Sequence, residues 1–508
     1  MHSLKNNVKI VPFVLIISFL NLLLFHFPFY KFVFYNIDYK SFNGIALIIS
    51  LILLMLLVNS IVFFLVFFLS RFVGKFLLVL FFMINALAVY FINTYNVIID
   101  ESMIGNVLNT KYSEASSFFS VKLILYLLLA VIPGIYIIRV KIVNVTVKKF
   151  LLITSLSLLS ILTLVFANAS SWLWIDKNSK ILGGLAMPWS YTVNISLFYI
   201  HKYKKSEKEI LLPNATIKDN LKSVVVLVIG ESARSQNFSL YGYQKNTNPL
   251  LSKTHNVFHF NANSDATYTT GGIKSILEHT NSDKLYEILP NYLYRNNVAV
   301  VWRTTNWGEP PVRVKNYQNR DVLMPICKGD GCNYDEVLLA GLKEQILESK
   351  KNKILIVLHT STSHGPSYSK KYPPQFETFK PVCNSVELGN CSQTELINAY
   401  DNTIIYTDYI LNNIIENLKQ LKEYKSTMMF VSDHGESLGE KNLYMHGLPI
   451  SIAPKEQYEI PFIVWLSDNS SKQLKPHKTL SQNHVFHSVL NFLNIDSPIY
   501  KEEMNIFK

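Results

Sequence analysis

The chain has 508 residues, enough for two or three domains, and 49% of them are hydrophobic. Its formal net charge is +12, yet the basic residues form no arginine-rich arm and no zinc-finger pattern, which argues against a nucleic-acid-binding protein. We interpret the charge as membrane orientation combined with attraction to anionic lipid head groups.

Long apolar runs in the first third of the chain predict five membrane-spanning helices. Each run approaches or exceeds the roughly 20 residues that cross a bilayer core. The first run lacks a small-residue cleavage site and is followed by further spans, so we expect it to be retained rather than removed as a signal peptide. The five runs are Val11 to Phe29, Gly44 to Ser70, Phe72 to Ile92, Val121 to Ile138 and Phe150 to Phe166.

Basic residues predict the orientation of these spans. They precede the first span and lie between the second and third and between the fourth and fifth, whereas the other loops carry few. The positive-inside rule then places the N-terminus in the cytoplasm and everything after the fifth span outside it. The residues concerned are Lys5, Lys9, Arg71, Lys75, Arg139, Lys141, Lys148 and Lys149.

A three-part division of the chain follows from composition. Residues 1–167 are expected to form the transmembrane domain, 168–222 an interfacial bridging segment, and 223–508 an exported domain. The bridging segment contains Trp172, Trp174, Trp189 and Tyr191 and a basic run at residues 201–205, which is typical of a membrane interface. A solvated linker is the alternative interpretation.

The four cysteines fall in two local pairs, Cys327 with Cys332 and Cys383 with Cys391. Disulfides that close short loops suit an exported domain. The alternative is a zinc site built from all four, although the spacings are not those of zinc knuckles.

Apolar, β-branched runs alternate with helical stretches after residue 222. This order predicts an α/β fold with a mostly parallel central sheet covered by helices on both faces. The expected strands are Val224 to Ile229, Val298 to Trp302, Ile354 to Leu358, Met428 to Val431 and Phe462 to Leu466, and the expected helices are Lys284 to Arg295, Val337 to Ser349 and Leu396 to Leu421.

Polar side chains follow three of these strands. Glu231 follows the first, His364 the third, and Asp433 with His434 the fourth; His446 comes a little later. Since the carboxyl ends of parallel strands lie on one edge of a sheet, we expect these residues to meet there. Carboxylates mixed with imidazoles are ligands that zinc selects, so the pattern predicts a zinc site.

A threonine-rich segment leads into a helix that begins near Ile273. The N–H groups at a helix N-terminus bind phosphate oxygens, and a metal-bound threonine hydroxyl there could attack phosphorus. Thr267, Thr269 and Thr270 are all eligible by chemistry, and a plain Ser/Thr-rich helix cap is the alternative.

Several motifs occur in a fixed order: Gly230 to Arg234, Ser363 to Pro366, Asn398 to Asn402, Ser432 to Gly439, Tyr444 to Gly447 and Ala453 to Gln457. Together they resemble the phosphoethanolamine transferases that modify lipid A and lipopolysaccharide core, which include the mobile colistin-resistance enzymes. That family lies in the alkaline phosphatase and sulfatase superfamily. The resemblance covers nearly the whole chain, because family members also have five spans before a periplasmic domain.

The resemblance implies roles for particular residues. Glu231, Thr267, Asp433 and His434 would bind a catalytic Zn2+, and Thr267 would carry the phosphoethanolamine. His364 and His446 would act as catalytic or substrate-binding histidines or hold a second zinc. Both cysteine pairs match family disulfides.

The loop after the third span supplies further candidates. Met103 to Asn106 and the downstream Glu114 resemble a family loop that holds the phospholipid head group. Independently, Asn106, Thr110 and Glu114 are spaced as i, i+4 and i+8, which places them on one face of a helix. They are predicted to bind the ethanolamine ammonium; a solvated loop helix is the alternative.

The chain departs from the family at the nucleophile. Many members have cysteine two residues before the threonine, in a disulfide with another just beyond it. Here that residue is Asp265, and no cysteine occurs between Ser223 and Pro325. The threonine segment must therefore be held by other contacts.

The expected function is transfer of phosphoethanolamine from phosphatidylethanolamine to a lipopolysaccharide acceptor, by a monomeric inner-membrane enzyme whose catalytic domain lies in the periplasm. The acceptor could be a lipid A phosphate, Kdo or a core heptose. A phosphoglycerol transferase of the lipoteichoic acid synthase type and a non-catalytic lipid-binding membrane protein are the alternatives. A sulfatase is disfavoured, because the nucleophile segment lacks the C/S-x-P-x-R pattern that formylglycine requires.

Overall fold

The computed structural model describes residues 7–37, 39–110, 115–167, 174–175, 178–204, 209–385 and 388–508. Over these residues the chain forms two compact units, each described here by itself. The helical unit comprises Met1–Leu108 and Phe119–Ile200, and the sheet unit comprises Asn109–Phe118 and His201–Lys508. The predicted three-part division at residues 167 and 222 stays a prediction.

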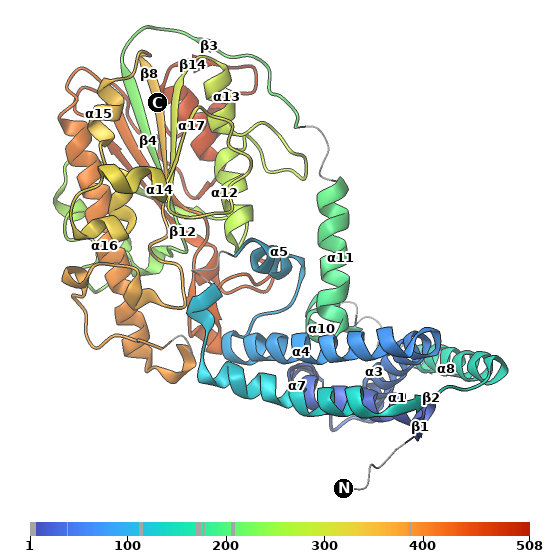
Figure 1. The fold of residues 1–508 in the computed structure, drawn as a ribbon. Helices are drawn as coiled ribbons and strands as arrows, with labels where there is room; N and C mark the ends of the chain where they lie inside the picture. Colours follow the sequence, from blue (N-terminus) through green and yellow to red (C-terminus); the bar gives the residue numbers. More distant parts are fainter. Residues whose placement is uncertain are drawn as a thin grey trace. The chain divides into compact units, whose positions relative to one another are not determined.

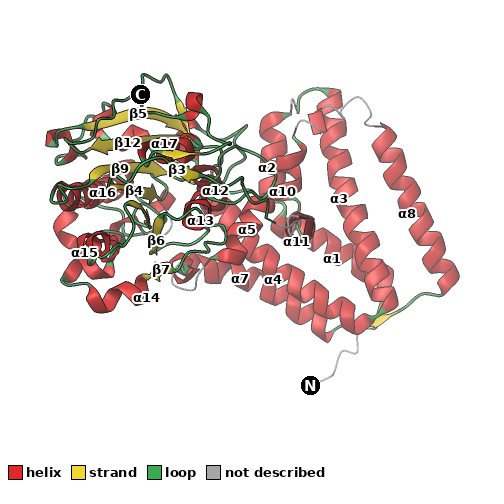
Figure 2. Ribbon diagram, turned by 90° about the horizontal axis from the view of Figure 1, so that it is seen from above, coloured by secondary structure: helices red, strands yellow, loops and turns green. Residues whose placement is uncertain are grey.

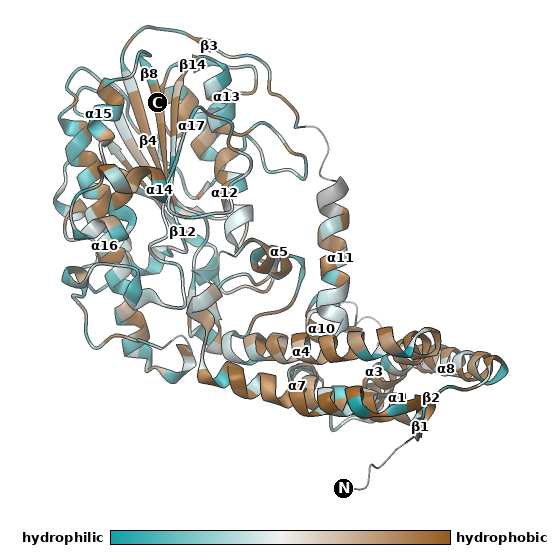
Figure 3. Cartoon of the chain, in the orientation of Figure 1, coloured by the Kyte–Doolittle hydropathy of each residue, from teal (hydrophilic) through white to brown (hydrophobic). Residues whose placement is uncertain are grey.

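The helical unit contains long apolar helices, which Figure 3 colours mostly brown. Four of them are long and apolar enough to cross a membrane, with mean hydropathies from 2.1 to 3.0. They match the second to fifth predicted spans. The helices of this part of the chain are α1 (Ile10–Phe25), α2 (Phe27–Asn36), α3 (Phe42–Leu69), α4 (Arg71–Tyr95), α5 (Glu101–Asn109), α7 (Val121–Arg139), α8 (Val147–Ala167), α10 (Ser179–Leu185) and α11 (Trp189–Lys204), with a short parallel pair β1 (Asn7–Lys9) and β2 (Lys141–Val143).

The first predicted span differs from a single helix. It covers α1 and the start of α2, which are bent by 65° at a break. Pro28 lies in the first turn of α2, and a proline ring removes an N–H and clashes with the preceding turn, which explains a break here. Counting the bent pair as one span gives five spans, as the sequence predicts.

Buried amides hold α11 within the helical unit. Asn85 of α4 donates to Asn21 of α1 (2.7 Å), and Tyr191 of α11 donates to Asn85 (2.9 Å). Trp189 donates to Asn59 of α3 (2.8 Å). Residues 189–200 of the predicted bridging segment therefore pack on the membrane helices, whereas Trp172 lies outside the described residues.

The sheet unit is built on an eight-stranded sheet in the order β13-β5-β12-β9-β4-β8-β6-β7 (Figures 1 and 2). The five strands β9, β4, β8, β6 and β7 are parallel, so the predicted α/β fold with a mostly parallel sheet is confirmed. The strands are β4 (Ser223–Gly230), β5 (Val257–Asn263), β6 (Ala299–Thr304), β7 (Asn316–Asn319), β8 (Lys353–His359), β9 (Lys425–Ser432), β12 (Glu459–Leu466) and β13 (Leu480–Ser481).

Strand β12 runs against its neighbours. It is antiparallel to both β9 and β5, so β5 points the same way as β9. The carboxyl ends of β5, β9, β4, β8 and β6 consequently share one edge, and the segment that leads into β12 reaches the same edge. This double reversal brings the residues after Asn263 to the edge where Glu231 and Asp433 lie.

Helices cover both faces of the sheet (Figure 1). Val225, Leu227 and Ile229 of β4 belong to a buried cluster with residues of α12 (Thr269–Leu277), α13 (Leu289–Arg295) and α17 (His484–Phe492). The alternate residues of β4 point to the opposite face, which α16 (Gln393–Lys419) covers. Shorter elements complete the unit: α14 (Arg320–Leu323), α15 (Leu342–Leu347) and the pairs β10 (Ser437–Leu438) with β11 (Tyr444–Met445) and β3 (Thr216–Ile217) with β14 (Ile495–Asp496).

Both predicted disulfides are confirmed. Cys327 is bonded to Cys332, and Cys383 is bonded to Cys391. The alternative of a four-cysteine zinc site is therefore wrong.

Candidate active site

Glu231, Asp433 and His434 meet at the carboxyl edge of the sheet. Gly230 of β4 is in register with Ser432 of β9, so the residues that follow these two strands are neighbours. One ligand atom from each of the three side chains lies within 4.8 Å of the others. All three side chains are fully buried.

Hydrogen bonds fix the two carboxylates. Asp433 Oδ1 accepts from the N–H groups of Ser232 (3.0 Å) and His434 (2.7 Å). Glu231 accepts from the Ser232 hydroxyl (2.6 Å) and from the Asn306 amide (2.6 Å). Asp433 Oδ2 is buried and accepts no hydrogen bond from any described residue, which is costly unless a ligand completes it.

The tautomer of His434 leaves Nε2 as a lone-pair donor. Its Nδ1 lies 2.8 Å from the carbonyl oxygen of Gly435, a contact that requires a proton on Nδ1. Nε2 then faces Asp433 Oδ2 at 3.3 Å and Glu231 Oε1 at 3.5 Å. Two carboxylate oxygens and an imidazole nitrogen, oriented by outer hydrogen bonds, are a donor set that fits a divalent zinc ion.

Burial and mutual charge perturb these groups. Burial raises the pKa of Asp433 well above its ordinary value, and the neighbouring Glu231 charge raises it further. Burial likewise opposes ionisation of Glu231, but the charges of His364, His434 and His446 lower its pKa below the usual range. Burial lowers the pKa of His434 to about 4. A neutral imidazole between carboxylates is the form that binds a metal.

A second group shares His434. His434, Glu436 and His446 also bring ligand atoms within 4.8 Å of one another. Glu436 accepts from Tyr368 (2.5 Å) and lies 2.7 Å from His446 Nδ1. Although burial lowers the pKa of His446, the Glu436 carboxylate raises it to about 9.

His364 joins this second group. Its ring centre is 5.6 Å from that of His446, and the rings of His434 and His446 are 4.1 Å apart. The three histidines that the strand-end pattern selects therefore lie together on one edge. Their individual roles stay predictions.

The threonine segment lies against the same edge. Thr267 is 2% exposed and its hydroxyl donates to the Leu448 carbonyl (2.5 Å), whereas Thr269 Oγ1 lies 3.3 Å from His434 Nε2. Thr269 opens α12, whose first N–H groups have no acceptor within the helix. A Cβ on Gly272 would come 2.0 Å from the Asp433 carbonyl oxygen, so a glycine permits this close approach.

Asp265 lies two residues before Thr267, where the family resemblance leads us to expect cysteine. Its backbone N–H donates to Gln482 (3.2 Å). Burial raises the pKa of its carboxyl group, and the nearby Ser275 and Asn281 oppose that rise. Its Oδ2 is buried and accepts no hydrogen bond from any described residue. Gln482 in turn donates to the Ser432 and Asp433 carbonyls (2.9 and 2.7 Å). These bonds connect the threonine segment to the ligand strand without a disulfide.

The predicted ethanolamine-binding loop is only partly described. Asn106 lies in α5, Thr110 follows the last residue of that helix, and Glu114 lies outside the described residues. The helix ends at Asn109, which leaves only Asn106 on it. The binding role of the three residues stays a prediction.

Sequence reasoning assigned no role to several residues of this edge. Asn306 lies two residues after the end of β6, so the same strand-end rule that selected Glu231 could have found it. Gln457 accepts from Leu448 N and donates to Ser437 and Met445, joining the loops around His446. Gln457 precedes β12. Because β12 is antiparallel to its neighbours, which the sequence did not predict, its amino end lies at the same edge as the carboxyl ends of the other strands. No sequence pattern marked Tyr368 as a residue of the site.

Fold and site define a multi-pass membrane protein with a hydrolase-like α/β unit of the sulfatase and alkaline phosphatase type. The family described as Sulfatase matches residues 223–495, and the family described as Phosphoethanolamine transferase EptA/EptB matches residues 55–203.

Similarity to three known proteins defines the class of protein more narrowly. The phosphoethanolamine transferase EptA of Helicobacter pylori is 39% identical over 96% of this chain and 94% of its own length. The integral membrane lipooligosaccharide phosphoethanolamine transferase A of Neisseria meningitidis superposes with a TM-score of 0.87 at 25% identity, covering 98% of both chains. The periplasmic domain of EptC from Campylobacter jejuni superposes with a TM-score of 0.52 at 36% identity, covering 59% of this chain and 97% of that domain.

The chain belongs to the phosphoethanolamine transferases and is a transferase enzyme. The predicted family, fold and enzyme class are confirmed. The site residues are not tested by these likenesses.

Proposed function

We propose that the protein transfers phosphoethanolamine from phosphatidylethanolamine to a phosphate or hydroxyl of a lipopolysaccharide acceptor, through a threonine-bound intermediate. One observation carries the proposal: a buried group of Glu231, Asp433 and His434, with an unpaired Asp433 oxygen, beside a threonine-rich helix N-terminus. We place the enzyme in the inner membrane as a monomer, with the sheet unit in the periplasm.

Glu231, Asp433, His434 and Thr267 are the proposed zinc ligands. Zinc bound there would lower the pKa of the threonine hydroxyl and stabilise charge on the phosphoryl oxygens. His364 and His446 would contact the transferred group or hold a second zinc.

The reaction has two halves. The Thr267 oxygen attacks the phosphorus of the donor, the bond from phosphorus to the glycerol oxygen breaks, and diacylglycerol leaves with a proton. An oxygen of the acceptor then attacks the same phosphorus, the bond to the threonine oxygen breaks, and Thr267 regains its proton. Each half exchanges one phosphorus–oxygen bond for another, so no further reactant is needed.

The chain's own groups can position the phosphoryl group and move protons. The first N–H groups of α12 can donate to phosphoryl oxygens. Glu436 fixes the His446 ring through Nδ1, which leaves Nε2 to give a proton to the leaving alcohol or take one from the acceptor. His364 is the second candidate for that role.

Full-length protein tests the nucleophile. We would express wild type, Thr267→Ala, Thr269→Ala and the matched control Thr270→Ala in cells that lack their own phosphoethanolamine transferases, and analyse lipopolysaccharide by mass spectrometry. We expect the adduct with wild type and Thr270→Ala and its loss with Thr267→Ala. An adduct that persists in Thr267→Ala but disappears in Thr269→Ala would move the nucleophile to Thr269.

A donor test separates the proposal from its nearest alternative. Purified enzyme in detergent is given phosphatidylethanolamine or phosphatidylglycerol, and diacylglycerol release is measured. Release from phosphatidylethanolamine is the expected result. Preferential release from phosphatidylglycerol would instead indicate a phosphoglycerol transferase.

A further inference from the structure

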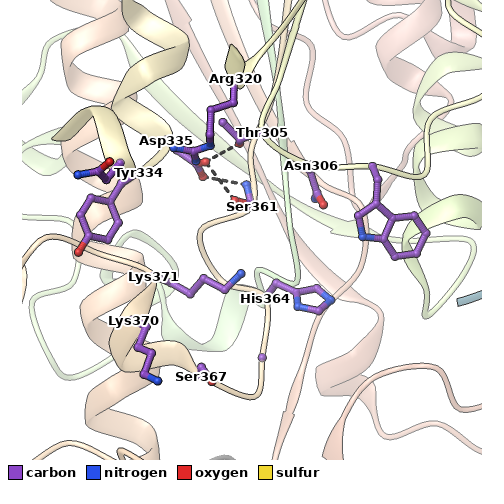
Figure 4. Close-up of a pocket in the computed structure, with 13 residues that line it drawn as sticks. Thr305, Asn306, Arg320, Tyr334, Asp335, Ser361, His364, Ser367, Lys370 and Lys371 are labelled. Carbon is purple, nitrogen blue, oxygen red and sulfur yellow. Dashed lines mark hydrogen bonds between the residues drawn. The ribbon is translucent and has the colours of Figure 1, made fainter. Parts of the chain in front are cut away.

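A polar pocket lies next to the candidate zinc ligands, within the sheet unit. It is a cavity of ≈340 Å³ at the carboxyl ends of β6 and β8 (Figure 4). Thr305 and Asn306 come from the end of β6, and Ser361 and His364 come from the segment after β8. Asn306 and His364 also belong to the candidate active site, so a group bound in the pocket would lie beside the reacting phosphorus.

The pocket carries an excess of positive charge. Arg320, Lys370 and Lys371 line it together with a single carboxylate, Asp335. Arg320 is anchored by donating to the Cys332 carbonyl (3.0 Å), so the Cys327–Cys332 disulfide loop supports it. Among the described residues, neither Arg320 nor Lys370 forms an ion pair.

The one carboxylate is already saturated by hydrogen bonds. Asp335 accepts from the hydroxyls of Thr305 (2.5 Å), Thr362 (2.5 Å) and Ser361 (3.1 Å) and from the Ser361 N–H (2.8 Å). Figure 4 shows the bonds that Asp335 makes with Thr305 and Ser361 on the side of the pocket away from Lys370. Asp335 therefore holds the loop after β8 in place, and no ion pair with Lys370 is found among the described residues.

A buried hydroxyl in the lining lacks a partner. Ser367 Oγ is shielded from solvent and makes no hydrogen bond to any described residue. A buried hydroxyl without a partner is unfavourable, and an anionic oxygen in the pocket would supply the missing acceptor. Cations and an unused hydroxyl donor together specify a phosphate or carboxylate.

The same charge excludes the donor's head group. An ethanolamine ammonium would be repelled by three cations. The donor's own phosphate has its place at Glu231, Asp433 and His434 in the proposed reaction. An anion held in the pocket would therefore lie beside the reacting phosphate, on the side that contains His364.

We propose that this pocket binds an anionic group of the acceptor glycolipid, a phosphate monoester or a sugar carboxylate, and so selects the acceptor. The inference rests on the proposed transfer reaction. It assigns acceptor recognition to Arg320, Lys371, Lys370 and Ser367, and it predicts that the second half of the reaction depends on them while the first does not.

The experiment measures the two halves separately with full-length enzyme in detergent. The first is diacylglycerol release and the phosphoethanolamine-enzyme adduct without acceptor; the second is transfer to purified glycolipid. We expect Arg320→Gln and Lys371→Gln to lower kcat/KM for the acceptor about 10- to 100-fold, since charge-assisted bonds are lost. Adduct formation should stay within about two-fold of wild type.

Controls separate recognition from folding. Lys350→Gln makes the same charge change on an exposed residue before the amino end of β8, and it should match wild type in both halves. Lys371→Arg should restore acceptor transfer. Equal loss of adduct formation in Lys371→Gln, or unchanged acceptor transfer, would overturn the proposal. Failure of wild type to form any adduct would instead contradict the proposed function.

Two acceptor series identify the anion. Lipid A with and without its phosphates, and with and without Kdo, is given to wild type and Lys371→Gln. If removing the phosphates abolishes the difference between the two enzymes, the pocket binds phosphate; if removing Kdo does so, it binds the carboxylate. A defect that survives both removals would show that the pocket binds neither group.

Discussion

Two groups of histidines in the sheet unit differ in their neighbours. The edge histidines His364, His434 and His446 lie beside Glu231, Asp433 and Glu436. The α17 histidines, which are His279, His477, His484 and His487, lie on or against helix α17. Rings approach one another in both groups: His434 and His446 are 4.1 Å apart between centres, and His477 and His484 are 5.6 Å apart.

The difference is the presence of carboxylates. Burial lowers the pKa of all four α17 histidines, to about 4 for His279 and His484. At the edge, by contrast, Glu436 raises the pKa of His446 to about 9 despite burial. Both metal-like groups found among the described residues lie at the edge. Clustered histidines alone therefore do not indicate a metal site, whereas carboxylates directed at an imidazole nitrogen do.

The largest effect is expected at Asp433. Asp433→Asn keeps the shape and an acceptor for Ser232 and His434 but removes the charge from the unpaired oxygen. We expect loss of bound zinc and a fall in transfer of at least ~10³-fold. Zinc content by elemental analysis and adduct formation check this. His484→Gln, in the other group, should keep both; a zinc-loaded Asp433→Asn would contradict the ligand assignment.

Glu436 should have an intermediate effect. Glu436→Gln leaves a hydrogen-bonding group for Tyr368 but weakens the orientation of His446, and outer partners of metal-site histidines are worth about 10- to 100-fold. Diacylglycerol release measures the loss. The exposed Glu423→Gln is the matched control, and equal rates for the two variants would remove Glu436 from the site.

A substitution at Asp265 tests whether every carboxylate at the edge of the sheet is needed for zinc binding. Its carboxylate lies near Ser275 and Asn281, which lower its pKa against the effect of burial, and it is in neither of the metal-like groups found among the described residues. Asp265→Ala should slow adduct formation about 3- to 10-fold through a looser threonine segment, with zinc content unchanged. Loss of zinc in this variant would show that Asp265 belongs to the ligand group.

The α17 histidines should make the stability of the fold depend on pH. Because the folded pKa of His279 and His484 is about 4 and the unfolded value about 6.5, the unfolded chain binds more protons between these values. Stability is fully present above about pH 6.5 and falls as the pH drops toward 4. When the pH is lowered from 7.5 to 5, the free energy of unfolding of His484→Gln should fall by about 1 kcal/mol less than that of wild type. Identical losses in thermal unfolding would contradict the assignment.

Much of the fold could be predicted from hydrophobic runs. The strands β4, β6, β8, β9 and β12 were found because they are buried apolar segments. Strand β5 was missed, since most of its side chains are partly or fully exposed and polar residues interrupt it. Strand direction was not predictable either, because an apolar run reads the same both ways.

The residues of the candidate site could likewise be predicted only in part. Glu231, Asp433 and His434 could be found because they directly follow parallel strands, a position that sequence marks. The choice among the threonines could not be made, because it depends on side-chain directions in a segment that follows an unrecognised strand. Asp335 and Tyr368 lie in loops whose paths are set by tertiary hydrogen bonds, which no local pattern records.

The antiparallel β12 has a consequence for how the site is assembled. It separates β5, which leads to the threonine segment, from β9 and β4, which lead to the ligands. The two halves of the site therefore meet only through tertiary contacts, such as the close approach of Gly272 to the Asp433 carbonyl oxygen. A side chain introduced at Gly272 would disturb both halves together.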